Sequence, residues 1–232
     1  MDFILSFLKL FIPKPIFKTF QPSYHLFLAY LAAAIYRFPS GGLKVIGVTG
    51  TNGKSTVVHL IASILEEAGE KTASVSSLRF RINGEESKNA LKMTMPGRFK
   101  LQKFLRQAVR AGCKYAVLEV TSEGIKQFRH IGINFYIAVL TNVTPEHIES
   151  HGSFEAYRAA KAELFKNAKI HVLNGEDPSI EYFLKISALS ADKPAYKRVV
   201  YSKKDLPTDF KLKMLGDFNV ENAVAAYHVG KI

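Results

Sequence analysis

One stretch in the first third of the chain constrains its fold more than any other. Residues 43–48 (LKVIGV) form a short apolar, β-branched run that predicts a buried strand. The chain then turns through Gly50 and Gly53 into Lys54, and the apolar spacing of residues 57–68 predicts a helix. A strand, a glycine-rich turn with a lysine and a helix are the layout of a phosphate-binding loop. Backbone N–H groups and the positive end of the helix can hold phosphate oxygens there.

The lysine and two hydroxyls at the start of this helix add a second argument. In nucleotide-binding loops the lysine lies on the β- and γ-phosphates and a hydroxyl binds magnesium, which assigns these tasks to Lys54 and to Ser55 or Thr56. The general pattern G-x-x-x-x-G-K-[ST] would need glycine at position 48, where this chain has Val48. A glycine-rich turn without a ligand is the alternative, although an exposed lysine and two hydroxyls serve no packing purpose there.

Strand-like and helix-like segments alternate from residue 43 onward. Further strands are predicted at 71–76, 78–82, 115–120, 133–141, 170–173 and 199–202, and further helices at 99–111, 154–168, 178–189 and 219–228. Asn83-Gly84 predicts a turn that closes a hairpin. The alternation predicts an α/β fold, with a mainly parallel sheet covered by helices on both faces.

Polar side chains follow two of the predicted strands. Glu119 ends one strand, and Asn142 and His147 follow another. Ligands bind beyond the carboxyl ends of parallel strands, so these carboxylate, amide and imidazole groups predict a magnesium site beside the phosphates. Taken singly, Asn142 also fits a turn or a helix cap, and His147 fits a solvated first helical turn.

Six segments occur in an order that resembles one known family. They are residues 49–56 (TGTNGKST), 119–124 (EVTSEG), 141–147 (TNVTPEH), 151–165 (HGSFEAYRAAKAELF), 174–178 (NGEDP) and 216–222 (GDFNVEN). Over residues 43–230 the chain resembles the central ATP-binding domain of the Mur ligases, in particular that of UDP-N-acetylmuramoyl-tripeptide synthetases. The resemblance implies an ATP-dependent ligase of peptidoglycan precursor synthesis. Such an enzyme joins a UDP-muramoyl-peptide carboxylate to an amino acid through an acyl phosphate.

The resemblance also assigns roles to the loop and its surroundings. ATP would be held by Gly50, Thr51, Asn52, Gly53, Lys54, Ser55, Thr56, Asn142, Asn219 and Asn222. Mg²⁺ would be bound by Ser55, Glu119, His147 and, once carbamylated by carbon dioxide, Lys161. The catalytic residues would be Lys54, Lys161 and His147. From its helical pattern alone, Lys161 reads as an ordinary solvated lysine, and the pair Asn219 and Asn222 reads as helix caps.

A third group of residues matches positions that contact the muramoyl substrate in the family: Thr94, Thr121, Ser122 and Arg129. Thr121 replaces a usual serine and keeps the hydroxyl. Met95 and Glu123 depart from the threonine and histidine that are usual at these places. The identity of the acceptor therefore stays open.

Residues 1–42 differ in composition from the rest of the chain. Two apolar runs, 2–12 and 24–36, are both shorter than the roughly 20 residues that span a bilayer. Asp2 argues against a signal peptide. Lysines and an arginine among the apolar residues indicate a pair of helices on an anionic membrane surface. Helices that cap an exposed face of the ATP-binding domain are the alternative.

The net charge of the chain narrows its partners. A value of +12 favours anionic partners such as nucleotides, a nucleotide-sugar or an acidic membrane surface, and the sequence carries no signature of nucleic-acid binding. The single Cys113 precludes an internal disulfide and fits a reducing compartment. We therefore expect a cytoplasmic protein, with peripheral contact at the inner face of the membrane.

These patterns predict two parts, an apolar helical segment at 1–42 and a central ATP-binding domain at 43–232. By the resemblance, a uridine-binding domain and a C-terminal domain are absent, so a partner chain or domain is expected to supply the missing C-terminal function. Two alternatives remain, an amidating ligase acting on a lipid-linked muropeptide and a non-catalytic ATP-binding module at the membrane. A folylpolyglutamate synthetase shares the fold but fits segments 119–124 and 141–147 less well.

Overall fold

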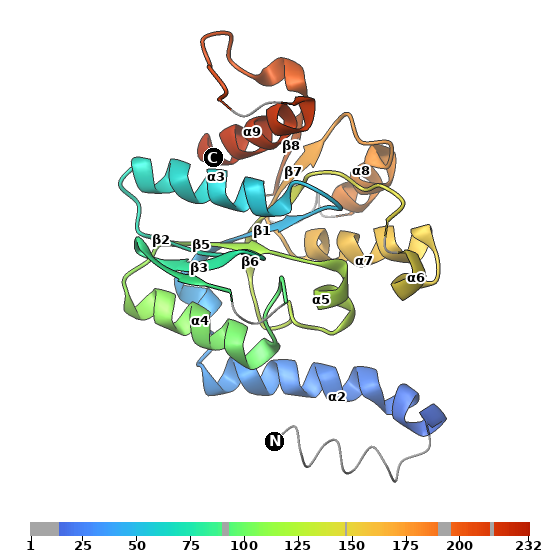
Figure 1. The fold of residues 1–232 in the computed structure, drawn as a ribbon. Helices are drawn as coiled ribbons and strands as arrows, with labels where there is room; N and C mark the ends of the chain where they lie inside the picture. Colours follow the sequence, from blue (N-terminus) through green and yellow to red (C-terminus); the bar gives the residue numbers. More distant parts are fainter. Residues whose placement is uncertain (1–13, 90–92, 147, 190–195, 214–215) are drawn as a thin grey trace.

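The computed structural model of this chain describes residues 14–89, 93–146, 148–189, 196–213 and 216–232. An eight-stranded sheet runs through the centre of the described chain, with helices on both of its faces (Figure 1). The predicted α/β fold is therefore confirmed. The predictions made for residues 1–13 and for His147 lie outside the described residues.

The sheet is mainly parallel, as predicted. In spatial order its strands are β4 (Glu85–Lys88), β3 (Arg79–Ile82), β2 (Thr72–Val75), β5 (Tyr115–Glu119), β1 (Lys44–Thr49), β6 (Phe135–Leu140), β7 (Ile170–Asn174) and β8 (Lys197–Tyr201). All neighbouring pairs from β2 to β8 are parallel. The edge pair β3 and β4 is antiparallel and forms the hairpin predicted from Asn83-Gly84, where both residues have positive φ.

β1 is buried on both faces at the centre of the sheet. Ile46 and Val48 pack into the apolar cluster on one face, and Val45 packs into the cluster on the other face. A β-carbon at Gly47 would lie 2.8 Å from the ring of Phe135, so this position has no room for a side chain. A strand covered on both faces needs a continuous apolar sequence rather than an alternating one, and residues 45–48 provide it.

The helices form one layer on each face of the sheet (Figure 1). α3 (Lys54–Glu67) and α9 (Asp217–Gly230) cover one face; α4 (Arg98–Arg110), α5 (Ser122–Lys126), α7 (Phe154–Lys166) and α8 (Ile180–Ala188) cover the other. The chain leaves β1 through α3 and leaves β6 through α6 (Ile148–His151) and α7, toward opposite faces. In open α/β sheets ligands bind beyond the carboxyl ends of two such strands. The short helices α5 and α6 were not predicted from the sequence.

α2 (Lys14–Ile35) lies outside these layers, against α4 (Figure 1). It begins well before the apolar run predicted at 24–36 and contains Pro22. Ala29 and Ala33 are fully buried, and a β-carbon at Gly132 would lie 2.6 Å from Cβ of Ala33. A short 3₁₀ turn, η1 (Pro39–Gly42), then leads into β1. Among the described helices, none combines the length and the apolar character needed to cross a bilayer.

Candidate functional site

The loop between β1 and α3 is packed so closely that two of its positions require glycine. A β-carbon at Gly50 would lie 1.8 Å from Oγ1 of Thr141, and one at Gly53 would lie 2.2 Å from Oδ1 of Asn222. Gly53 also has a φ of 80°, in the left-handed region that other residues adopt at a cost. The two glycines therefore let side chains from β6 and α9 reach the loop backbone.

The loop ends at a helix N-terminus with unpaired backbone donors. The first backbone bond of α3 runs from the N–H of Val57 to the carbonyl of Gly53. The N–H groups of Lys54, Ser55 and Thr56 therefore precede the helical hydrogen-bond ladder. Together with the positive end of the helix dipole, these donors form an anion-binding position at the end of β1.

The rest of the loop is bonded to the segment that follows β6. Thr51 donates its N–H to the carbonyl of Asn142 at 2.8 Å, and Asn52 donates its N–H to Oδ1 of Asn142 at 2.9 Å. Thr141 Oγ1 donates to the carbonyl of Asn52 at 2.6 Å. The structure thus places Asn142 as a scaffold of the loop. The N–H groups of Thr51 and Asn52 are engaged by protein, which leaves those at the start of α3 for a ligand.

Two further side chains hold the loop and were not singled out from the sequence. Tyr157 of α7 places its hydroxyl 3.1 Å from Oγ1 of Thr51. Glu146 accepts a hydrogen bond of 3.0 Å from the side-chain amide of Asn52. Both lie within the segments that carry the family resemblance, which is the signal that could have identified them.

Two lysines approach the loop from inside the protein. Lys54 donates from Nζ to the carbonyl of Thr51 at 2.6 Å, and Lys161 donates from Nζ to the carbonyl of Gly50 at 2.7 Å. Lys161 is only 2% exposed, and its Nζ lies 4.2 Å from the ring centroid of Tyr157. The alternative of a solvated lysine is therefore wrong, because α7 turns this residue toward the loop rather than toward water.

Burial shifts the pKa values of both lysines. It lowers the pKa of Lys161 to about 7, and the nearby charge of Lys54 lowers it as well. Burial also lowers the pKa of Lys54, while the carboxylates of Glu119 and Glu146 oppose this shift. A buried amine that titrates near neutral pH is available as the neutral base, which a solvated lysine is not.

A hydroxyl and a buried carboxylate meet beside the start of α3. Ser55 Oγ donates to Oε2 of Glu119 at 2.7 Å, and the N–H of Ser77 donates to the same oxygen at 2.9 Å. Glu119 is 3% exposed. Hydroxyl and carboxylate oxygens next to a phosphate position fit Mg²⁺, which typically takes few protein ligands and completes its shell with phosphate oxygens and water. The third expected ligand, His147, lies outside the described residues.

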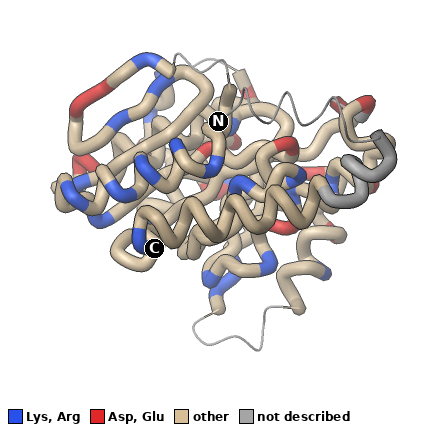
Figure 2. Tube along the Cα trace, turned by 90° about the horizontal axis from the view of Figure 1, so that it is seen from below, with Lys and Arg blue, Asp and Glu red and all other residues tan. Residues whose placement is uncertain are grey.

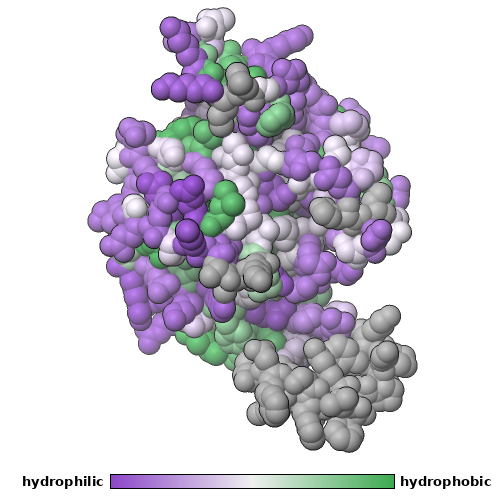
Figure 3. All heavy atoms as spheres, viewed as in Figure 1, coloured by the Kyte–Doolittle hydropathy of each residue, from purple (hydrophilic) through white to green (hydrophobic). Residues whose placement is uncertain are grey.

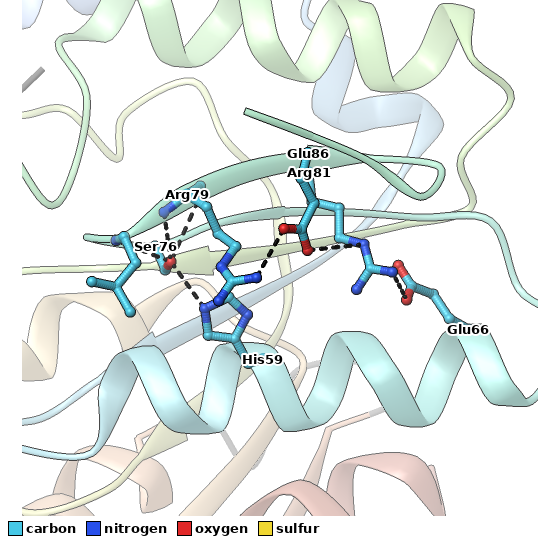
Figure 4. Close-up of polar contacts among 7 residues, drawn as sticks. His59, Glu66, Ser76, Arg79, Arg81 and Glu86 are labelled. Carbon is cyan, nitrogen blue, oxygen red and sulfur yellow. Dashed lines mark hydrogen bonds and ion pairs between the residues drawn. The ribbon is translucent and has the colours of Figure 1, made fainter. Parts of the chain in front are cut away.

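A polar network ties the β3–β4 hairpin to α3 (Figure 4). Arg81 pairs with Glu66 of α3 at 3.0 Å and with Glu86 of β4 at 3.7 Å. His59 of α3 places Nε2 3.4 Å from Oγ of Ser76, just after β2. The network fixes the turn between β2 and β3. This turn contains Ser77, whose backbone N–H donates to the buried carboxylate of Glu119.

The asparagine pair of α9 lies partly against the loop. Asn222 is 4% exposed and contacts Gly53, as described above. Asn219 lies one helical turn earlier and is partly exposed. Gly216 is the N-cap of α9, so neither asparagine is the N-cap residue of this helix. Contact of either with a nucleotide base stays a prediction.

Two more side chains that the sequence did not single out, Asn174 and Asp177, support the segment after β6. Asn174 donates from Nδ2 to the carbonyl of Thr141 at 2.8 Å and to Oε2 of Glu221 at 3.0 Å. Asp177 accepts from the N–H of Val143 at 2.5 Å and from a backbone N–H of its own turn at 2.8 Å. Burial raises the pKa of Asp177, and the two backbone bonds oppose that rise. These side chains hold the strand end that in turn holds the loop.

Three of the expected substrate residues already have structural partners. Thr121 is the N-cap of α5, where its Oγ1 accepts from the N–H of Gly124 at 3.0 Å. Ser122 Oγ lies 3.1 Å from Nε2 of His151. Arg129 donates to the backbone carbonyl of Met95, which itself packs on Gly124.

The same contacts bring the expected substrate residues into one region. Thr94 precedes Met95 and is half-buried, and the guanidinium of Arg129 also donates to Oε1 of Gln127 at 2.6 Å. Burial lowers the pKa of Arg129. The segment around Thr94 therefore lies against α5 and the turn after it. Binding of substrate there remains a prediction.

Comparisons with known proteins agree with this geometry. A family model described as the Mur ligase middle domain matches residues 48–230. The UDP-N-acetylmuramyl-tripeptide synthetase of Roseiflexus sp. (strain RS-1) is 34% identical over an aligned length of 254 residues. This alignment covers 94% of this chain and 49% of that protein. A solved structure of a UDP-N-acetylmuramoyl-L-alanyl-D-glutamate–2,6-diaminopimelate ligase has a TM-score of 0.72 at 28% identity, covering 82% of this chain and 43% of that chain.

The fold is shared beyond these proteins. A folylpolyglutamate synthase of Mycobacterium tuberculosis has a TM-score of 0.71 at 17% identity, covering 89% of this chain and 58% of that chain. At that identity the likeness shows the fold alone. The chain spans about half the length of the first curated relatives it matches.

Proposed function

The chain belongs to the Mur ligase family, and from this premise we propose that it carries the ATP-binding half of an ATP-dependent ligase. The ligase joins the carboxylate of a UDP-muramoyl-peptide-type substrate to the amine of an amino acid, in peptidoglycan precursor synthesis. The observation that carries the proposal is the convergence of Lys54, Lys161 and the Ser55–Glu119 pair on one glycine-lined loop.

The loop supports ATP as the anionic ligand. Its glycines let the backbone approach phosphate oxygens, and the N–H groups at the start of α3 supply directed donors. Lys54 has only the carbonyl of Thr51 as its hydrogen-bond acceptor in the described structure, a contact that a phosphate oxygen can replace. Mg²⁺ held by Ser55 and Glu119 would neutralise part of the phosphate charge.

The reaction has two steps. A carboxylate oxygen of the acceptor attacks the γ-phosphorus of ATP, the bond from that phosphorus to the bridging oxygen breaks, and ADP leaves. The amine nitrogen then attacks the acyl carbon, the carbon–oxygen bond breaks, and phosphate leaves while the nitrogen loses a proton. Both steps gather anionic groups, and Lys54 with the helix N-terminus is placed to reduce their repulsion.

Carbamylation of Lys161 is part of the proposal. The neutral amine nitrogen would attack the carbon of carbon dioxide and lose a proton, which converts the amine into a carbamate whose carboxylate could bind a second Mg²⁺. Burial and a pKa of about 7 support this step, because a large fraction of the amine is neutral at physiological pH.

The remaining partners follow from the same proposal. The muramoyl-peptide would lie along Thr94, Ser122 and Arg129, which the fold gathers beside the carboxyl end of β5. A partner domain or chain would bind the incoming amine. We propose a cytoplasmic location, where ATP and nucleotide-linked precursors are made.

ATP turnover tests the proposal. Phosphate release by the purified chain is measured with Mg²⁺, with and without a UDP-muramoyl dipeptide and a panel of amino acids, and ATP binding is measured in parallel by calorimetry. Lys54→Ala should weaken ATP binding at least tenfold. Lys185→Ala, an exposed lysine on α8, is the matched control and should bind ATP as the wild type does.

The outcomes separate the parts of the proposal. Substrate-dependent phosphate release that Lys54→Ala abolishes supports a ligase that works on this chain. Tight, Lys54-dependent ATP binding without release supports a half-site that needs its partner. Absence of Mg²⁺–ATP binding by a folded wild-type chain refutes the proposal.

A further inference from the structure

We propose that α2 and α4 together form a docking surface for an anionic lipid bilayer. The surface consists of the outward apolar face of α2 and the outward basic face of α4, and it is separate from the nucleotide loop.

The amphipathic arrangement of α2 is the reverse of that expected for a helix on a soluble domain. Its inward face is made of the small side chains Ala29, Ala32 and Ala33, each fully buried. Its outward face presents large apolar side chains, among them Phe27 at 63% exposed and Ile35 at 58%, together with Leu26, Tyr30 and Leu31. Apolar residues this large, gathered on one exposed face, mark an interaction site rather than ordinary surface.

The apolar face continues beyond the end of the helix. Phe38 lies three residues after the end of α2 and is 52% exposed. Its φ is positive, as is that of Arg37, so the chain turns sharply here before η1. Figure 3 shows apolar atoms along the lower edge of the molecule, where α2 lies in the view of Figure 1.

α4 supplies positive charge beside this face. It buries Leu101, Phe104, Leu105 and Ala108 against the sheet, and its other side carries Lys100, Lys103, Arg106 and Arg110. The helix has no acidic residue. Residues 21–35 of α2 contain no Lys, Arg, Asp or Glu. In the view from below, α2 crosses the front of the molecule, and α4 lies beside it with its row of basic residues (Figure 2).

Contacts between the two helices hold these faces in a fixed relation. Arg98 at the start of α4 lies 3.0 Å from Nδ1 of His25 on α2 and donates to the carbonyl of Gln127. Ala33 packs on Gly132, which also lies beside Gln102 of α4. The apolar face and the basic row therefore belong to one rigid surface.

An anionic bilayer fits this surface better than a second copy of the chain. Two copies meeting through α2 would bring two α4 rows together in a protein of net charge +12, which like-charge repulsion opposes. A bilayer offers hydrocarbon for the apolar side chains and anionic headgroups for the cations beside them. This is the arrangement by which interfacial helices bind membranes.

Vesicle co-sedimentation of the full chain tests the inference. The probes are sucrose-loaded vesicles of phosphatidylcholine alone and of phosphatidylcholine with phosphatidylglycerol, at low and high salt. We expect at least tenfold stronger binding to the anionic vesicles, weakened by salt. Phe27→Ser/Ile35→Ser and Lys100→Glu/Lys103→Glu should each reduce binding at least tenfold.

Matched controls come from the opposite end of the molecule. Phe210→Ser/Phe218→Ser removes two exposed aromatic side chains, and Lys211→Glu/Lys213→Glu makes the same change in net charge on an exposed segment. Both should bind anionic vesicles as the wild type does, with folding checked by circular dichroism. The inference is overturned if wild type fails to bind anionic vesicles, or if the control variants lose as much binding as the α2 and α4 variants. It is also overturned if Phe27→Ser/Ile35→Ser abolishes a dimer of the wild type while vesicle binding is absent.

Discussion

Replacing Lys161 by methionine should remove a pH dependence of stability that this one buried amine creates. The change keeps the length and much of the volume of the side chain and removes its charge. In the folded chain the pKa of Lys161 lies at about 7 instead of 10.5, because burial disfavours the ammonium form and Lys54 adds repulsion. The folded state therefore resists protonation of this group, whereas the unfolded state does not.

The direction and size of the change in stability with pH follow from the pKa values of Lys161 in the folded and the unfolded state. Below the folded pKa both states hold the proton, and the folded state bears the full cost of the buried charge. Between about pH 7 and pH 10.5 the unfolded state binds more protons, so stability rises with pH. Each pKa unit corresponds to about 1.4 kcal/mol, and integration from pH 7 to pH 9 gives a gain of about 2 kcal/mol in the free energy of unfolding.

Urea unfolding at pH 7 and pH 9, in buffer free of carbon dioxide, measures this gain. The wild type should become more stable relative to Lys161→Met by about 2 kcal/mol between the two pH values. Taking the difference between the proteins cancels other groups that titrate in the same range. Lys166→Met, an exposed lysine on the same helix, is the control and should follow the wild type. Parallel pH profiles for wild type and Lys161→Met would refute the assignment of the low pKa to burial.

Three other predictions follow from single contacts. Gly53→Ala should destabilise the fold by about 1–3 kcal/mol and weaken ATP binding at least tenfold, because the added β-carbon would meet Asn222 and φ at this position is positive. Gly41 has open space around it, so Gly41→Ala should change neither the stability nor the ATP binding. Asp177→Ala should lower the free energy of urea unfolding by about 1–3 kcal/mol through loss of two backbone hydrogen bonds, and an unchanged unfolding midpoint would contradict this. Burial lowers the pKa of His130 from 6.5 to about 4, so between these pH values the unfolded state binds a proton that the folded state does not. The free energy of unfolding of the wild type should therefore fall by up to about 3 kcal/mol from pH 6.5 to pH 4. His130→Leu should show a correspondingly smaller loss in acid unfolding followed by circular dichroism.

Local sequence determined the sheet and the position of the loop. The apolar, β-branched residues 45–48 predicted a buried strand, and the glycines and hydroxyls after them place a phosphate-binding turn before a helix. Both signals depend on residues close together in the chain, so they survive without knowledge of the tertiary structure. The hairpin at Asn83-Gly84 was predictable for the same reason.

Several roles depended on contacts between distant segments. Asn142 was expected as a ligand contact and Tyr157 was given no role, yet both bond the loop across about 90 to 110 residues of chain. Asn174 and Asp177 act indirectly, because they hold the end of β6, which in turn holds the loop. The apolar periodicity of the sequence does not predict such pairings, because it indicates which face of a helix or strand is apolar and not which residues that face contacts.

The sequence by itself therefore determined the α/β fold and the chemical type of the loop, because short-range backbone preferences and apolar patterning decide both. Only the tertiary structure decided the state of Lys161. The pattern of its helix is compatible with a solvated lysine, and the low pKa exists because α7 packs that side chain under the loop beside a second cation. The same holds for α2, whose small side chains turn inward, with Ala33 against Gly132, and whose large apolar side chains turn outward.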